Sequence, residues 1–99
     1  MKLLQIDFHW EGPFGEELQK GLNDLAHSIA QEEGLIWKIW TENDQEKRAG
    51  GIYLFETYEQ AKNYANKHQE RLAFAGASDF MIHFFDVNTP LSLITKAPF

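Results

Sequence analysis

One strand-forming segment, residues 35–41, constrains the fold more than any other part of the chain. It reads Leu-Ile-Trp-Lys-Ile-Trp-Thr, with bulky apolar side chains at both odd and even positions. Because successive side chains of a strand point to opposite faces of a sheet, Trp37 and Trp40 lie on opposite faces. Two helical segments in a chain of 99 residues cover one face of an antiparallel sheet and leave the other open. A second copy of the same sheet is the simplest cover, so the sequence predicts a homodimer.

The composition argues against several classes of partner and site. A net charge of -6 and a pI near 5.1 disfavour nucleic acid and anionic membrane surfaces, whose binding needs clustered Lys and Arg. The chain has no cysteine, which rules out disulfides, thiolate catalysis and cysteine-ligated metals. No apolar run reaches membrane-spanning length, and residues 1–7 lack the apolar core of a signal peptide. The sequence therefore predicts one cytoplasmic globular domain over residues 1–99, with no nucleic acid and no membrane as partner.

The spacing of apolar residues predicts the order of the main elements. These are a strand over 3–10, a helix carrying Leu18, Leu22, Leu25 and Ile29, strands over 35–41 and 49–55, a helix capped by Thr57, and a strand over 78–87. Thr89 and Pro90 predict the cap and first position of a short terminal helical turn. The order strand, helix, strand, strand, helix, strand is that of the ferredoxin-like βαββαβ fold. We expect this α+β class, with two helices on one face of a four-stranded antiparallel sheet.

The pairing of the strands decides which apolar side chains lie on the open face. In the two assignments considered, that face carries either Trp40, Met81 and Phe85, or Trp37, Tyr53 and Phe84. Either set is too large an apolar patch for a soluble monomer. We therefore expect one of the two tryptophans to line a pocket and the other to lie in the interface between two sheets.

The second predicted helix carries a histidine on its apolar face. Ala61, Ala65, His68 and Leu72 recur at helical spacing, and this face is directed at the sheet. A histidine titrates near neutral pH and can accept a proton from a substrate, which makes His68 the leading candidate for a catalytic base. The alternative is a structural histidine whose ring is hydrogen-bonded to a carbonyl or a tyrosine.

Two adjacent glycines interrupt the predicted strand 49–55. Glycine weakens a strand and often marks a bulge or a close backbone approach, so we expect a β-bulge at Gly50 and Gly51. A ligand lying against this backbone is the alternative interpretation. Tyr53, later in the same strand, is expected either to fill the core or to offer its hydroxyl to a substrate oxygen.

Three residues raise the question of a metal site. Asp7 and His9 share one face of the first strand, and His83 lies on a strand expected to pair with it. Two histidines and a carboxylate can hold iron or zinc. Such triplets are frequent by chance, and the relative parity of the two strands is open. The sequence therefore predicts no metal site.

Four strings of residues resemble the YdhR family of mono-oxygenases, and the resemblance runs almost from end to end. They are Gly12–Gly15, Trp37–Glu42, Ala49–Phe55 and Phe85–Asn88. The resemblance implies a dimeric α/β barrel, related to the antibiotic-biosynthesis mono-oxygenases that oxidise aromatic polyketides without metal or flavin. It also implies that no cofactor is needed.

The same resemblance implies a cofactor-independent mono-oxygenase that oxidises a small phenolic or quinol-like aromatic in an apolar pocket between sheet and helices. Such chemistry needs a group that takes the acidic proton of the substrate and polar contacts for the resulting anion. We expect His68 to take the proton and Trp37, Trp40, Tyr53 and Tyr58 to shape the pocket. The alternative function is a non-catalytic homodimer that binds a small hydrophobic ligand in the same pocket.

The haem-degrading branch of this superfamily is similar in fold but differs at its site. It carries a tryptophan and a histidine on the second helix and an asparagine on the first strand. Here Tyr58 would stand in place of the tryptophan, and the first strand offers Gln5 or Asp7 in place of the asparagine. This departure argues against haem degradation.

Overall fold

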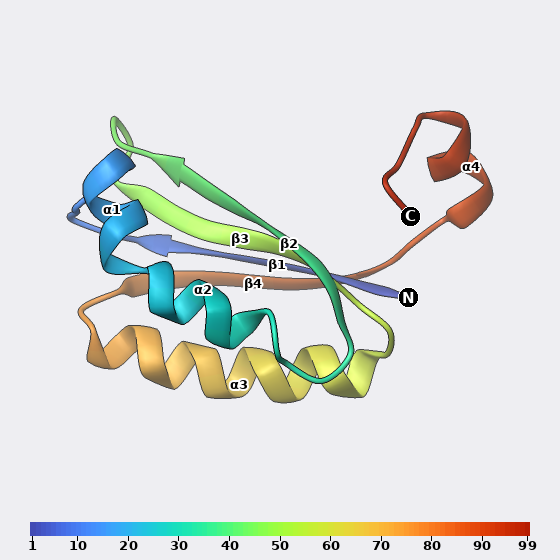
Figure 1. Ribbon diagram of the computed structural model, residues 1–99, viewed down its shortest axis with the longest axis horizontal. Coiled ribbons are helices and arrows are strands. Elements are labelled where there is room, and N and C mark those ends of the chain that lie inside the picture. Colours follow the sequence, from blue (N-terminus) through green and yellow to red (C-terminus); the bar gives the residue numbers. More distant parts are fainter.

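The computed structural model describes residues 1–99 and has eight regular elements (Figure 1). In chain order they are β1 (Lys2–His9), α1 (Gly15–Gly21), α2 (Asn23–Ile29), β2 (Leu35–Asn43), β3 (Arg48–Phe55), α3 (Tyr58–Phe74), β4 (Ser78–Asp86) and α4 (Thr89–Ile94). The strands form one antiparallel sheet in the order β2-β3-β1-β4. The predicted ferredoxin-like βαββαβ fold is confirmed.

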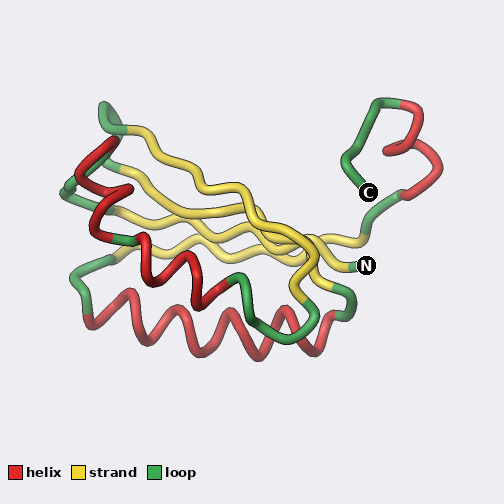
Figure 2. The backbone as a smooth tube through the Cα atoms, in the orientation of Figure 1, coloured by secondary structure: helices red, strands yellow, loops and turns green.

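Helices α1, α2 and α3 all lie on the same face of the sheet. Figure 2 shows α1, α2 and α3 on one side of the four strands, with the opposite face uncovered. In the register of the central strand, Leu4 of β1 lies opposite Tyr53 of β3 and Phe84 of β4. Leu4 and Tyr53 are buried in the core beneath α3, so these three side chains belong to the helix-covered face.

The structure corrects the predicted membership of the open face. Trp37 pairs with Leu54, whereas Trp40 pairs with Gly51. The register therefore places Trp37 on the open face and Trp40 on the helix-covered face. The remaining large apolar residues of the open face are Leu3, Ile39, Ile52, Leu54, Met81 and Phe85. Both predicted sets mixed the two faces, because the face of a residue depends on register, and a register shift between Leu35 and Trp37 offsets β2 against β3.

The first predicted helix is divided into α1 and α2 at Leu22. The backbone at Leu22 has φ -106° and ψ 8°, outside regular helical geometry, although hydrogen bonds from Leu22 to Leu18 and from Ala26 to Leu22 bridge the break. Gly21 precedes it, and glycine is a weak helix former. Leu18, Leu22 and Leu25 stay half-buried, since they line a cavity instead of filling the core.

The α3 helix forms the main cover of the sheet and begins where the sequence predicts. The Thr57 hydroxyl accepts a hydrogen bond from the Gln60 amide, and the Gln60 side chain accepts one from the Thr57 amide, which completes a capping box. The buried face of α3 consists of Ala61, Tyr64, Ala65 and His68. The two alanines let the helix approach the strands closely, which brings His68 against the sheet.

The predicted bulge at Gly50 and Gly51 is wrong. The pairing of β3 with β1 is regular through both glycines, with Gly50 opposite Asp7 and Gly51 opposite Ile6. The glycines serve close packing instead. A Cβ atom on Gly50 would overlap the carbonyl oxygen of Ile6, and one on Gly51 would lie 2.6 Å from Cε of Lys38. The second contact shows that the Lys38 side chain, and not a bulge, uses the space above Gly51.

The C-terminal α4 helix extends beyond the end of the sheet, away from the other helices (Figure 1). Its cap is Asn88, whose side chain accepts a hydrogen bond from the Leu91 amide, so the predicted cap Thr89 is instead the first helical residue. Leu91, Leu93 and Ile94 are exposed on it. None of the helices is both long and apolar enough to cross a membrane.

Candidate functional site

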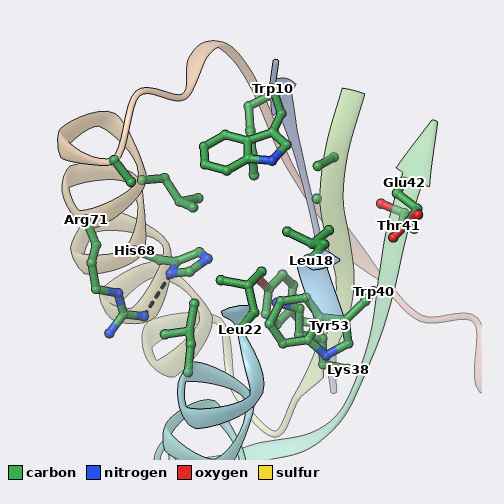
Figure 3. Close-up of a pocket in the computed structure, with 16 residues that line it drawn as sticks. Trp10, Leu18, Leu22, Lys38, Trp40, Thr41, Glu42, Tyr53, His68 and Arg71 are labelled. Atoms are coloured by element: carbon green, nitrogen blue, oxygen red, sulfur yellow. Dashed lines mark hydrogen bonds between the residues drawn. The ribbon is translucent and has the colours of Figure 1, made fainter. Parts of the chain in front are cut away.

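A cavity of about 150 Å³ lies between the helix-covered face of the sheet and helices α1 to α3 (Figure 3). Its walls are mainly apolar, formed by Phe8, Trp10, Leu18, Leu22, Leu25, Trp40, Ala49, Leu72 and Ala75. An apolar cavity of about 150 Å³ is large enough for one benzene-sized ring. The polar side chains at its boundary are Lys38, Thr41, Glu42, Tyr53, His68 and Arg71. The cavity therefore combines an apolar compartment for one ring with a small number of polar groups.

His68 projects from α3 into this cavity and is held in one orientation (Figure 3). It is 3% exposed, and its ring stacks on that of Tyr64 with 5.0 Å between centroids. The Arg71 guanidinium donates a hydrogen bond to Nδ1 of His68 over 2.8 Å. Because a guanidinium can only donate, Nδ1 accepts, and the hydrogen of the neutral ring is assigned to Nε2.

Burial and neighbouring positive charges keep the His68 ring neutral. Burial, followed by the positive charges of Lys38 and Arg71, lowers the pKa of His68 from 6.5 to about 3. A ring with so low a pKa is a weak proton acceptor near neutral pH. Its Nε2 hydrogen is available instead as a hydrogen-bond donor to a group in the cavity.

Lys38 enters the cavity from β2 and was missed by reasoning from the sequence. Its Nζ lies 3.2 Å from the ring centroid of Trp40 and 4.6 Å from that of Tyr53. Burial, and then the positive charge of Arg71, lower the pKa of Lys38 from 10.5 to about 7. The lowered pKa makes the neutral amine accessible near neutral pH. The available sequence signal was its parity, because Lys38 and Trp40 are two residues apart in one strand and share a face.

Two tyrosines form a buried hydroxyl pair beside the cavity. The Tyr64 hydroxyl donates a hydrogen bond to the Tyr53 hydroxyl over 3.1 Å. Burial raises the pKa of Tyr53 to about 12 and raises that of Tyr64 further. Both phenols stay neutral, and since the Tyr53 oxygen accepts from Tyr64, its own hydrogen is free to be donated. Only Tyr53 of the pair lines the cavity.

Arg71 adds a fixed positive charge to this region. Its Nη2 donates to His68, its buried Nε has no hydrogen-bond partner, and no carboxylate pairs with the guanidinium. At the mouth of the cavity, the Glu42 carboxylate accepts a hydrogen bond from the Gly15 amide over 2.9 Å. Arg71, His68 and Tyr53 consequently present donors without a matching internal anion. This arrangement suits a ligand that carries a negatively charged oxygen.

The structure brings together only some of the site residues predicted from the sequence. His68, Trp40 and Tyr53 line the cavity, and Lys38 and Arg71 join them. Trp37 lies on the open face of the sheet, where its indole nitrogen is buried without a partner. Tyr58 is 44% exposed at the start of α3, where its ring packs on Phe84 with 5.2 Å between centroids.

The three residues considered as metal ligands have other partners or stand apart. Asp7 accepts hydrogen bonds from Arg48, and Nε2 of His9 lies 3.2 Å from a Glu11 carboxylate oxygen. His83 packs beside Phe85. No group of three or more His, Cys, Asp or Glu side chains converges as a metal site.

Comparison with known proteins identifies both sequence and structural relatives. A family model described as "Putative mono-oxygenase ydhR" matches residues 3–98. The crystal structure of a putative antibiotic biosynthesis monooxygenase from Deinococcus radiodurans is similar, with a TM-score of 0.65 and 13% identity over 89% of this chain and 93% of that one.

A structure of a point mutant of MhuD is also similar, with a TM-score of 0.61 and 20% identity over 89% of this chain and 95% of that one. That protein holds two manganese protoporphyrin IX molecules per active site. At these identities the likeness of both structures establishes the fold. Among curated proteins, none matches the chain.

Proposed function

The chain belongs to the YdhR family of mono-oxygenases, and on this premise we propose that it oxidises a small phenolic or quinol-like aromatic without a metal or an organic cofactor. The observation that carries the proposal is the cavity, which has room for one ring and a polar end that offers hydrogen-bond donors and an amine. A phenol needs these two features, an apolar surface for its ring and donors for its oxygen once the oxygen is charged.

Such a substrate supplies all the electrons that dioxygen needs. A phenol and dioxygen yield a quinone and water. One O–H and one ring C–H bond break, one oxygen atom forms the new carbonyl, and the other leaves as water with the two hydrogens. Four electrons pass from the ring to oxygen, so no external reductant is required. Removal of the phenolic proton makes the ring electron-rich and starts the reaction with dioxygen.

The residues of the cavity divide the remaining tasks. Leu22, Leu72 and Trp40, which line the cavity, pack against the ring. His68 and Tyr53 hydrogen-bond the phenolate oxygen, and the nearby charge of Arg71 stabilises it. His68 therefore acts as a donor in this proposal, which differs from the base predicted from the sequence, because Arg71 occupies Nδ1 and the pKa of His68 is about 3.

Oxygen consumption tests this proposal. Chelator-treated protein is expected to take up oxygen with at least one member of a panel of hydroquinones, dihydroxynaphthalenes and anthrones. Replacing His68 by Leu removes one donor and should lower kcat about 100-fold. His68→Gln keeps an N–H donor and should retain more activity, while His27→Gln, at an exposed histidine of α2, serves as the control. Equal rates in all variants would exclude His68 from the chemistry.

The alternative function is a homodimer that binds a small hydrophobic ligand and does not catalyse. The observation that favours it is the low pKa of His68, which removes the base expected from the sequence. Binding of an aromatic ligand by the wild type, with no oxygen uptake across the panel, would support this function over the oxygenase.

We propose that the open face of the sheet joins two copies of the chain. Ile39, Met81 and Phe85 are 52%, 49% and 48% exposed on this face, and the indole nitrogen of Trp37, on the same face, lacks a hydrogen-bond partner. The register also places Phe85, Leu3, Leu54 and Trp37 in one apolar row across all four strands. An apolar row on an uncovered face is typical of a protein interface. The exposed leucines of α4 add to the apolar surface available to a second copy.

The mass in solution tests this interface. Light scattering at micromolar concentration is expected to give about twice the 11.5 kDa mass of one chain. Ile39→Asp places a charge on the open face and should shift the mass to that of one chain. Phe74→Asp is the control, because Phe74 is 96% exposed at the end of α3, away from that face. A monomeric wild type contradicts the dimer.

A further inference from the structure

Lys38 differs from the other cationic group of the cavity because it has no polar partner. Arg71 is held by its bond to His68, whereas Lys38 takes part in none of the ion pairs of the chain. Its amine nitrogen rests against the faces of Trp40 and Tyr53. The lone pair of the neutral amine is therefore free to accept a proton from a molecule in the cavity.

The groups that face Lys38 explain why the amine is available. From α3 come the Arg71 charge and the neutral His68 ring, and from β3 comes the neutral Tyr53 phenol. Glu42, four residues along β2, has its carboxylate engaged by the Gly15 amide. The parts of α1 and α2 that line the cavity are leucines. No carboxylate is thus paired with the amine to hold it in the charged form.

The fold also reserves space for this side chain. A Cβ atom on Gly51 would lie 2.6 Å from Cε of Lys38 and 3.1 Å from a ring carbon of Tyr53. A larger residue at this position would force the end of the Lys38 side chain to move. Gly51 therefore leaves the space that the end of the Lys38 side chain occupies beside the cavity.

We propose that Lys38 is the proton acceptor for a phenolic substrate, a role that rests on the function proposed above. The phenolic O–H bond breaks, its hydrogen joins Nζ as a proton, and the electron pair stays on the oxygen. The new ammonium lies over the rings of Trp40 and Tyr53, whose faces attract a cation. The phenolate then has the ammonium, the Nε2 hydrogen of His68 and the Arg71 charge on its side. The ammonium returns the proton to the reduced oxygen that leaves as water.

A phenol that changes colour on ionisation tests this step without any turnover. The probe is 3-nitrophenol, whose phenolate absorbs visible light, added under nitrogen at a pH of about 7.5, just above the pKa of about 7 for Lys38. The wild type is expected to bind it as phenolate, with a phenolate-to-phenol ratio at least about tenfold above that of Lys38→Met. Lys20→Met, at an exposed lysine of α1, should behave as the wild type.

The number of protons released separates proton acceptance from simple charge attraction. Calorimetric titration with 3-nitrophenol in two buffers of different ionisation enthalpy measures this number. In the wild type the proton moves to Lys38, so less than half a proton per site should reach the buffer. In Lys38→Arg the guanidinium cannot accept it, and about one proton per phenolate formed should be released. Ionised probe in Lys38→Met, neutral probe in the wild type, or equal proton release in wild type and Lys38→Arg would each overturn the role of Lys38.

These results are independent of the oxygen measurements. If the wild type ionises the probe as described but consumes no oxygen with any substrate, the oxygenase proposal fails and Lys38 remains a proton acceptor for bound phenols. If oxygen is consumed while Lys38→Met leaves ionisation of the probe and kcat unchanged, the oxygenase proposal stands and the role of Lys38 fails.

Discussion

Replacing Gly50 by Ala is expected to destabilise the protein by about 3 kcal/mol or more, a large loss for a single methyl group. The added Cβ would overlap the carbonyl oxygen of Ile6 and lie 2.7 Å from the Cα atom of Asp7. Both atoms belong to the backbone of β1, which is bonded to strands on either side and cannot move alone. Urea unfolding followed by circular dichroism measures the loss.

Two other glycines of the chain serve as matched controls for this substitution. Gly51→Ala meets the flexible end of Lys38, so it should cost less stability than Gly50→Ala but disturb the ionisation of a phenol in the cavity. Gly21→Ala meets nothing within 4 Å near the end of α1 and should be neutral or stabilising by up to about 1 kcal/mol. Equal stability of the Gly50 and Gly21 variants would contradict the close approach of β3 to β1.

The free energy of unfolding is expected to rise with pH in two separate ranges. His68 has a pKa of about 3 in the folded chain and 6.5 as its ordinary value, so between these values the unfolded chain binds a proton that the folded chain does not. For Lys38, whose pKa is about 7 in the folded chain and 10.5 as its ordinary value, the unfolded chain likewise binds the extra proton between these two pH values. Stability therefore increases with pH across each range, by at most about 1.4 kcal/mol per pH unit for each group. As the pH falls through either range, the corresponding stability is lost.

Variants separate these two contributions from the titration of other groups. In Lys38→Met the rise above pH 7 should flatten, and this variant should be more stable than the wild type at pH 7, because no buried amine must lose its proton. In His68→Leu the slope between pH 4 and 6 should decrease. Urea unfolding at one protein concentration gives both slopes. The pH series ends near pH 10, because above it the raised pKa of Tyr53 makes the free energy of unfolding fall with pH. Wild-type slopes in both variants would show that neither group is buried as described.

The gain expected from Lys38→Met has a functional meaning. Lys38 places an amine in an environment that disfavours its charge, which reduces the stability of the folded chain at neutral pH. Functional groups commonly reduce stability in this way, since their reactivity depends on an environment that disfavours their charge. The same substitution is therefore expected to increase stability and remove proton acceptance.

Local patterns were sufficient for the order of the elements and for the α+β class. Helical spacing located His68 on the buried face of α3, and Thr57 was recognisable as the cap of that helix. The bulk on both faces of residues 35–41 indicated an uncovered sheet face, which the structure has. These features depend on residues within a few positions of one another. Over so short a distance, the period of the helix or strand determines the face to which each side chain points.

The three-dimensional arrangement alone decided which side chains share the cavity. Trp37 and Trp40 could be placed on opposite faces from their spacing, but only the register between β2 and β3 determined which of them faces the helices. The roles of Lys38 and His68 also depend on distant contacts, because Arg71 sets the hydrogen position on His68 and contributes to the low pKa of both groups. Register and electrostatic environment are properties of segments far apart in the chain, and a one-residue shift in pairing would exchange the two faces of a strand. For that reason a lysine that reads as an ordinary surface residue becomes, in the folded protein, the amine of the cavity.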